Sequence, residues 1–180
     1  MKIGTERIFS AAHILPEKFG KCHRLHGHNW KVIVEIEVED MGKDDVVVDF
    51  NVIKNLIDEL DHKTLISMYQ IDRIEYEQGG TLFPSDLDDL FYPKDVNKKS
   101  MSFLQLKDKG KVYDVDGRVF LTSDIVITKM EPTCENLSLL LTSSIIDLLG
   151  IHMPVKIIVR VYETEKSYAE NKENGLWYKG

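Results

Sequence analysis

The sequence predicts an α+β fold in which two strands, two helices and two further strands follow one another, with a long irregular stretch between the helices. Three observations predict it: segments in which apolar and polar residues alternate, segments with apolar residues at helical spacing, and turn residues between them. The chain has 180 residues, of which 43% are hydrophobic and 29% charged. These values are typical of one globular domain with a buried core.

The first half of this core is predicted to be two strands and a helix. Residues 2–13 mix polar and apolar positions, and we interpret them as a strand. Residues 26–38 alternate more clearly and place these apolar residues on one face: Trp30, Val32, Val34, Ile36 and Val38. After them the apolar residues recur at helical spacing from Asp49 to Leu60, and Asp49 or Asn51 can serve as the N-cap.

The second half is predicted to be a helix and two strands. Pro132 and Thr133 announce the helix, with Thr133 as its N-cap and Gly150 as its C-terminal stop. Residues 155–161 alternate again and predict a strand. A last strand is expected at about 168–178, although its apolar content is low.

The stretch between the helices, about residues 67–131, interrupts this order with glycines, prolines and many charges. Residues 111–122 predict a β-hairpin, because Asp116-Gly117 lies between β-forming residues. We therefore expect residues 1–180 to form a single domain that carries an insertion at about 67–131.

Charge and composition exclude several classes of protein. A formal net charge of -7 argues against broad binding to nucleic acid or to anionic membranes. No apolar run approaches the roughly 18 residues of a membrane helix, and the N-terminus shows no signal peptide. Two cysteines cannot make a disulfide scaffold, so we expect a cytoplasmic location.

The segment His26-Gly27-His28 is the first functional clue. Residues i and i+2 of a strand point to the same face, so both imidazoles can approach one ion. Three histidines with one open position are the usual ligands of a catalytic zinc ion. The third ligand has four candidates, of which we prefer His13 because it ends the first strand: His13, His23, His62 and His152. The alternative is that the pair only hydrogen-bonds to the backbone.

Two cysteines are candidates for a reactive thiol. Cys22 is surrounded by cations, which lower a thiol pKa and could also attract an anionic substrate: Lys18, Lys21, His23 and Arg24. Cys134 lies in the first turn of the predicted second helix, but a small buried apolar residue is the better interpretation of it. The alternative for Cys22 is an inert loop residue.

Three further residues could take part in chemistry. Asp61 and His62 close the first helix, where a histidine can complement the helix dipole or relay protons. Glu163 continues the buried face of the strand at 155–161, so its carboxylate could anchor a ligand. The alternative is that the strand has left the core by residue 163.

Together these residues resemble the 6-pyruvoyl-tetrahydropterin synthase/6-carboxy-tetrahydropterin synthase family. Six matching pieces occur in the order of that family and cover both ends of the chain. They are Phe9-Ser10-Ala11-Ala12-His13, Cys22-His23-Arg24-Leu25-His26-Gly27-His28, Val48-Asp49-Phe50, Leu60-Asp61-His62, Pro132-Thr133-Cys134-Glu135-Asn136 and Val161-Tyr162-Glu163-Thr164.

The resemblance implies a tunnelling fold (T-fold), with a four-stranded antiparallel sheet and two helices packed on one of its faces. It also implies a homohexamer of two stacked trimers, with active sites between subunits. The implied residues are His13, His26 and His28 as ligands of one zinc ion per subunit, Cys22 as base, Asp61 and His62 as relay, Glu163 as pterin anchor, and Thr133 and Glu135 near the pterin.

The three residues between Cys22 and His26 resemble the carboxy branch of the family. We therefore expect a zinc-dependent 6-carboxy-5,6,7,8-tetrahydropterin synthase, a lyase that acts on 7,8-dihydroneopterin triphosphate with loss of triphosphate and acetaldehyde. This reaction belongs to 7-deazaguanine synthesis, which leads to queuosine or archaeosine. The alternatives are a 6-pyruvoyl-tetrahydropterin synthase and a non-catalytic zinc- and pterin-binding protein. A cupin-like metal oxygenase is a third, which the predicted helices disfavour.

Overall fold

The structure is a computed structural model, and it describes residues 1–39, 46–76, 91, 103–106, 110–113, 119–122, 124–149 and 155–175. The chain forms two compact units. The first unit consists of Met1–Phe9, Asn29–Asp61 and Thr133–Gly180, and the second consists of Ser10–His28 and His62–Pro132.

Seven of the described strands form one sheet in the order β10-β9-β2-β1-β3-β8-β5, where a four-stranded antiparallel sheet is expected; the part in the first unit is β10-β9-β2-β1. Strand β1 (Lys2–His13) belongs to this unit up to Phe9, and strand β2 (His26–Val38) belongs to it from Asn29 onward. Strand β9 (Val155–Tyr162) pairs antiparallel with β2 and with β10 (Tyr168–Gly175). The predicted alternation is confirmed, because these apolar residues are buried: Trp30, Val32, Val34, Ile36 and Val38 in β2, and Val155, Ile157, Val159 and Val161 in β9.

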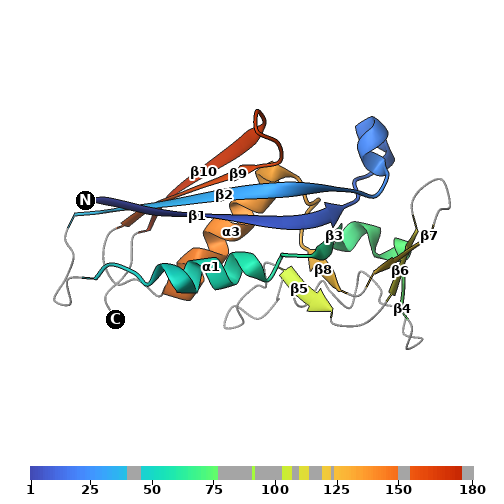
Figure 1. Cartoon of the computed structure of the whole chain (residues 1–180), viewed down its shortest axis with the longest axis horizontal. Coiled ribbons are helices and arrows are strands. Elements are labelled where there is room, and N and C mark those ends of the chain that lie inside the picture. Colours follow the sequence, from blue (N-terminus) through green and yellow to red (C-terminus); the bar gives the residue numbers. More distant parts are fainter. Residues whose placement is uncertain are drawn as a thin grey trace. The chain divides into compact units, whose positions relative to one another are not determined.

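Two helices complete the first unit. Helix α1 (Phe50–Asp58) begins after Asp49, whose carboxylate accepts a backbone N–H of the first turn at 2.9 Å. Helix α3 (Cys134–Leu149) begins after Thr133, whose hydroxyl oxygen accepts a backbone N–H at 3.4 Å. Helix α3 packs against β9 and β10 and contacts α1 (Figure 1). These are the four strands and two helices predicted for the core; the predicted stop at Gly150 lies outside the described residues.

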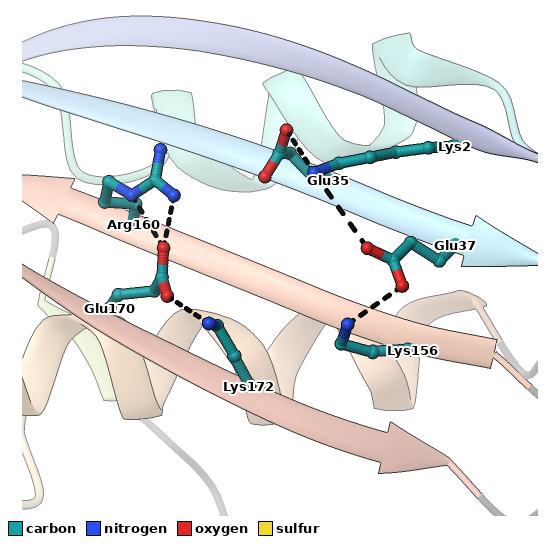
Figure 2. Close-up of polar contacts among 7 residues, drawn as sticks. All are labelled: Lys2, Glu35, Glu37, Lys156, Arg160, Glu170 and Lys172. Carbon is teal, nitrogen blue, oxygen red and sulfur yellow. Dashed lines mark hydrogen bonds and ion pairs between the residues drawn. The ribbon is translucent and has the colours of Figure 1, made fainter.

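Charged side chains of the same sheet pair across neighbouring strands and, for Glu170 and Lys172, within β10 (Figure 2). Lys2 Nζ lies 2.9 Å from a carboxylate oxygen of Glu35. The Glu170 carboxylate accepts hydrogen bonds from Arg160 and lies 2.7 Å from Lys172 Nζ. We call this set the charge ladder: Lys2, Glu35, Glu37, Lys156, Arg160, Glu170 and Lys172.

The second unit contains the rest of the seven-stranded sheet, in the order β1-β3-β8-β5. Strand β3 (Lys63–Ser67) runs parallel to the end of β1 and to β8 (Ile125–Thr128), whereas β5 (Phe103–Leu106) is antiparallel to β8. The sequence does not predict β3 or β8. Every residue of β8 is buried, and a strand buried on both faces lacks the alternation that reveals a strand.

The other elements of the second unit are short. The 3₁₀ segments are η1 (Glu17–His23) and η2 (Met68–Arg73). A small sheet has the order β4-β6-β7, with the bounds Ile74–Tyr76, Gly110–Tyr113 and Val119–Thr122. Strands β6 and β7 pair antiparallel, on either side of the turn where the sequence predicts a hairpin.

The core of the second unit is apolar. Seven buried residues form it, and Leu25 packs against them: Ile14, Ile66, Met68, Ile71, Phe91, Ile125 and Ile127. This core places the end of β1, β3 and β8 against η2. In the part of the chain that the structure describes, no helix has the length and apolar character needed to cross a membrane.

Candidate metal centre

Three histidines meet in the second unit at the ends of two strands. His13 is the last residue of β1, and His26 and His28 are the first and third residues of β2. Their ring nitrogens lie within 4.8 Å of one another. Gly27, between the two histidines of β2, lies against β1: a Cβ on it would lie 3.4 Å from the backbone oxygen of Ala11.

The hydrogen bonds of two of these rings define their tautomers. His13 Nδ1 lies 2.7 Å from the carbonyl oxygen of Pro132, and His26 Nδ1 lies 2.7 Å from the carbonyl oxygen of Arg24. A carbonyl oxygen only accepts, so both Nδ1 atoms carry the hydrogen and donate it. In a neutral imidazole the Nε2 atom then holds a lone pair.

The two Nε2 atoms of His13 and His26 face each other at 3.0 Å. Two lone pairs at this distance repel each other unless they share a cation. Burial lowers the pKa of His13 to about 4, although the hydrogen bond to Pro132 opposes this effect. A metal ion bound by both Nε2 atoms would remove this repulsion, and the spacing is close to what it needs: two nitrogens on tetrahedral zinc lie about 3.3 Å apart.

The other candidate histidines have different positions. His23 lies in η1, and neither of its buried ring nitrogens has a hydrogen-bond partner among the described residues. His62 follows helix α1, and His152 lies outside the described residues. The structure thus brings His13, the preferred third ligand, to the His26–His28 pair, in an arrangement compatible with a metal site.

The two cysteines differ in exposure. Cys22 is exposed in η1, and its backbone oxygen accepts the N–H of Leu15 at 3.3 Å, which closes the loop after β1. Cys134 is 8% exposed, and burial together with the adjacent Glu135 carboxylate raises its pKa to about 11. Only Cys22 is accessible to a substrate in the described structure.

Asp61 and His62 lie in the turn after helix α1. His62 has φ 56°, a left-handed conformation that is costly for a residue with a side chain. Its N–H donates to the carbonyl oxygen of Ser10 at 2.7 Å, and its side chain is exposed. Left-handed residues are common where helices end and also occur at functional sites, so the role predicted for His62 stays a prediction.

The predicted pterin-contacting residues belong to the first unit. Glu163 follows the last residue of β9, is half-buried, and donates its N–H to the carbonyl oxygen of Ser167 at 3.1 Å. The strand therefore ends one residue before Glu163 without exposing it fully. Thr133 caps α3, and Glu135 lies in the first turn, where its own backbone N–H and the Thr133 hydroxyl lower its pKa.

Three polar residues near the end of β1 and before Pro132 are not predicted from the sequence. Gln70 and Thr128 are buried, at 5% and 2% exposure, and Glu131 is half-buried. They lie in or beside the stretch interpreted as an insertion, and none belongs to a motif. Their only signal in the sequence is that Gln70 and Thr128 lie next to short apolar runs.

Comparisons with known proteins identify the family of the chain. The family model described as 6-pyruvoyl tetrahydropterin synthase matches residues 2–174. A curated relative from Pyrococcus abyssi, named "Putative 6-carboxy-5,6,7,8-tetrahydropterin synthase", is 30% identical over 170 residues, which are 94% of this chain and 88% of that protein. The 6-carboxy-5,6,7,8-tetrahydropterin synthase of Haemophilus influenzae is 38% identical over 69 residues, or 34% of this chain and 49% of that protein.

A solved structure shares the fold. The crystal structure of 6-pyruvoyl tetrahydropterin synthase from Plasmodium vivax has a TM-score of 0.61 and 19% identity, and the match covers 97% of this chain and 98% of that one. This likeness confirms the predicted α+β T-fold. Because the family model matches nearly the whole sequence, the chain belongs to the 6-pyruvoyl tetrahydropterin synthase family.

Proposed function

We propose that the protein is a zinc-dependent 6-carboxy-5,6,7,8-tetrahydropterin synthase. It acts on 7,8-dihydroneopterin triphosphate with loss of triphosphate and acetaldehyde, in the 7-deazaguanine synthesis that leads to queuosine or archaeosine. The coarser statement, that the chain is a lyase acting on pterins, follows from its family. The observation that carries the proposal is the histidine cluster, in which two lone pairs of His13 and His26 face each other at 3.0 Å.

Zinc is the proposed ion because three histidines that leave a fourth position open are typical of catalytic zinc sites. His13, His26 and His28 would hold it. When bound, zinc supplies Lewis-acid chemistry that polarises the substrate oxygens and acidifies the adjacent bonds. The Nδ1 hydrogen bonds of His13 and His26 hold both rings in the tautomer that a ligand needs.

The proton transfers are assigned to residues outside the cluster. Cys22, as a thiolate, removes a proton from carbon, and its exposure makes it accessible to a substrate. His62, oriented by Asp61, relays protons. Cations around Cys22 attract the triphosphate and explain how a protein with a net charge of -7 binds an anion: Lys18, Lys21 and Arg24.

The pterin ring is assigned to residues of the first unit. Glu163 accepts two parallel N–H bonds from the heterocycle, which a half-buried carboxylate can do without leaving the protein. Thr133 and Glu135 lie near the ring. The lowered pKa of Glu135 keeps its carboxylate ionised at neutral pH and therefore able to accept hydrogen bonds.

The proposed assembly is a homohexamer of two trimers, located in the cytoplasm, with active sites between subunits. Its support is the family resemblance, together with β10 and β5, which end the sheet among the described residues and which a ring of subunits could pair. The proposal includes no nucleic-acid or membrane partner.

The test is an anaerobic incubation of zinc-loaded protein with 7,8-dihydroneopterin triphosphate, with the products identified by mass spectrometry. We expect the 6-carboxy product and acetaldehyde. The 6-pyruvoyl product alone would assign the protein to the pyruvoyl branch with the same site. No turnover by metal-replete protein would favour the non-catalytic alternative and contradict the proposal.

Cys22→Ala tests the base within the same assay. We expect the variant to bind zinc as the wild type does and to lose about 10²- to 10⁴-fold in turnover. Cys134→Ala is the matched control, because its thiol is buried and stays protonated. Full turnover by Cys22→Ala with zinc bound would remove Cys22 from the mechanism.

A further inference from the structure

The two Nδ1 hydrogen bonds in the histidine cluster differ in the origin of their acceptors. His26 donates to Arg24, two residues away in the same loop. His13 donates to Pro132, which lies 119 residues away in the sequence. The first bond is fixed by local geometry. The second depends on whatever holds the segment around Pro132 beside the end of β1.

Gln70, in η2, makes this connection. Its Nε2 atom lies 3.5 Å from the carbonyl oxygen of Ile14 and hydrogen-bonds to a carboxylate oxygen of Glu131. Both partners only accept, so the side-chain nitrogen with its two hydrogens is the atom that can serve them together. Ile14 and Glu131 are the chain neighbours of His13 and Pro132. The Gln70 bridge therefore runs alongside the bond from His13 to Pro132.

A second side chain holds the same segment. Thr128 Oγ1 lies 2.6 Å from the carbonyl oxygen of Met130 and 3.3 Å from that of Ile66. This hydroxyl fixes the start of the turn between β8 and helix α3. Thr128 thus fixes the backbone of Met130. Gln70 then holds the following residue, Glu131, beside Ile14 at the end of β1.

The environment of this bridge is costly for its polar groups. Gln70 is 5% exposed, and its Oε1 atom is buried with no hydrogen-bond partner among the described residues. Burial raises the pKa of Glu131, although hydrogen bonds from Gln70 and Ser67 and the charges of Lys18 and Arg73 oppose this. An apolar residue at position 70 would avoid the buried orphan oxygen, so a polar residue there needs another explanation.

We infer that Gln70 is a positioning residue for the metal site: by bridging Ile14 and Glu131 it holds the Pro132 carbonyl where His13 Nδ1–H donates to it. This fixes the tautomer in which His13 Nε2 carries the lone pair that a metal ligand needs. The inference rests on the proposed zinc site for its functional meaning. Its structural part concerns the metal-free protein and stands by itself.

The first variant is Gln70→Met, which keeps the length of the side chain and removes both donated hydrogen bonds. Nitrogen-15 NMR of the metal-free protein reports the tautomer of His13, and competition with a chromogenic chelator reports zinc affinity. We expect a mixture of His13 tautomers and about tenfold weaker zinc binding, since partners that orient a ligand typically contribute 10- to 100-fold.

Two matched comparisons separate positioning from general stability. Thr142→Val removes a fully buried hydroxyl that donates to the carbonyl oxygen of Ser138 within α3. It should lower stability and leave the His13 tautomer and the zinc affinity unchanged. Glu131→Gln keeps an oxygen that accepts from Gln70, whereas Glu131→Leu removes it. We expect Glu131→Leu to weaken zinc binding and mix the His13 tautomers as Gln70→Met does. Glu131→Gln should keep the zinc affinity within twofold of the wild type.

If Gln70→Met does not fold, the two Glu131 variants decide alone. The inference is overturned if the bridge-breaking variants keep zinc affinity within twofold and a single Nδ1–H tautomer of His13. If the wild type itself binds no zinc, the proposed function fails. The tautomer measurement then still decides whether Gln70 positions the Pro132 carbonyl.

Discussion

In the first unit, the seven residues of the charge ladder pair with one another on an accessible face of the sheet (Figure 2). In the second unit, His13 and His26 each donate an Nδ1 hydrogen to a backbone carbonyl oxygen. Their Nε2 atoms face each other at 3.0 Å. The ladder pairs charges of opposite sign, whereas the histidine cluster brings together nitrogens that are suited to hold a cation.

This difference separates polar side chains that only stabilise the fold from polar side chains that are suited to bind a ligand. Exposed ion pairs contribute little and can be exchanged at small cost. Buried polar groups are expensive unless they are paired, so a cluster that leaves lone pairs in contact persists only if the bound state repays it. The comparison predicts large effects on function in the second unit and small effects in the ladder.

The largest effect is expected from His13→Ala. Loss of one of three ligands should weaken zinc binding at least about 10³-fold and reduce turnover to the background level, because a two-histidine site holds zinc poorly. Zinc content after dialysis measures it directly. Lys156→Ala, in the ladder, is the control that should retain one zinc per subunit. Zinc retained by His13→Ala would show that the cluster is not the metal centre.

The two thiols should differ nearly as strongly. Burial and the Glu135 carboxylate raise the pKa of Cys134 to about 11, so at pH 8 only about one molecule in a thousand carries its thiolate. Cys22 is exposed. Iodoacetamide at pH 8 should therefore alkylate Cys22 at least about 100-fold faster, as measured by peptide mass spectrometry. Equal rates would show that the N-terminus of α3 opens readily.

Acid should destabilise the metal-free protein through His13. Its pKa is about 4 in the folded protein against an ordinary value of 6.5, chiefly because of burial. Between these pH values only the unfolded chain takes up the proton, so stability is complete above pH 6.5 and falls as the pH drops to 4. The loss from this group is at most about 3 kcal/mol.

Urea unfolding of the metal-free wild type and of His13→Gln, from pH 7 to pH 4, measures this contribution. The variant lacks the titrating ring, so its stability should fall less over the same range. Other groups titrate in both proteins and cancel in the difference. Parallel curves for the two proteins would mean that His13 is not buried in the neutral form.

How much of this could be read from the sequence depends on the range of the interactions. The strands of the first unit and both helix caps are predictable, because alternation, helical spacing and residues such as Asp49 and Thr133 act locally. The spacing of His26 and His28 indicates two of the histidines, and His13 is one of four candidates for the third ligand. The resemblance to a family then added roles that spacing alone does not give.

The residues that were missed depend on distant partners. Gln70 and Glu131 hydrogen-bond across 61 residues, and no local pattern announces either of them. Strands β3 and β8 are short and buried on both faces, so they lack alternation. The stretch interpreted as an insertion therefore supplies β8 and the segment that carries the acceptor for His13.

A smaller effect is expected at His62. A residue with a side chain at φ 56° costs about 1 kcal/mol more than glycine, so His62→Gly should be about 1 kcal/mol more stable than His62→Ala. Denaturant unfolding of the pair measures this. Asn55, exposed within α1, is the control position, where the order should reverse because alanine favours the helix.

The smallest effect is expected in the ladder. Arg160 bonds to Glu170 and lies over the ring of Tyr168 at 5.6 Å, so the pair has good geometry. Even so, both side chains reach solvent, which screens their attraction. A double-mutant cycle of Arg160→Met and Glu170→Gln should give a coupling below about 1 kcal/mol, reduced further by salt, with zinc affinity unchanged. A coupling above about 2 kcal/mol would mean that this face is covered in solution and that the ladder, like the histidine cluster, is incomplete without a partner.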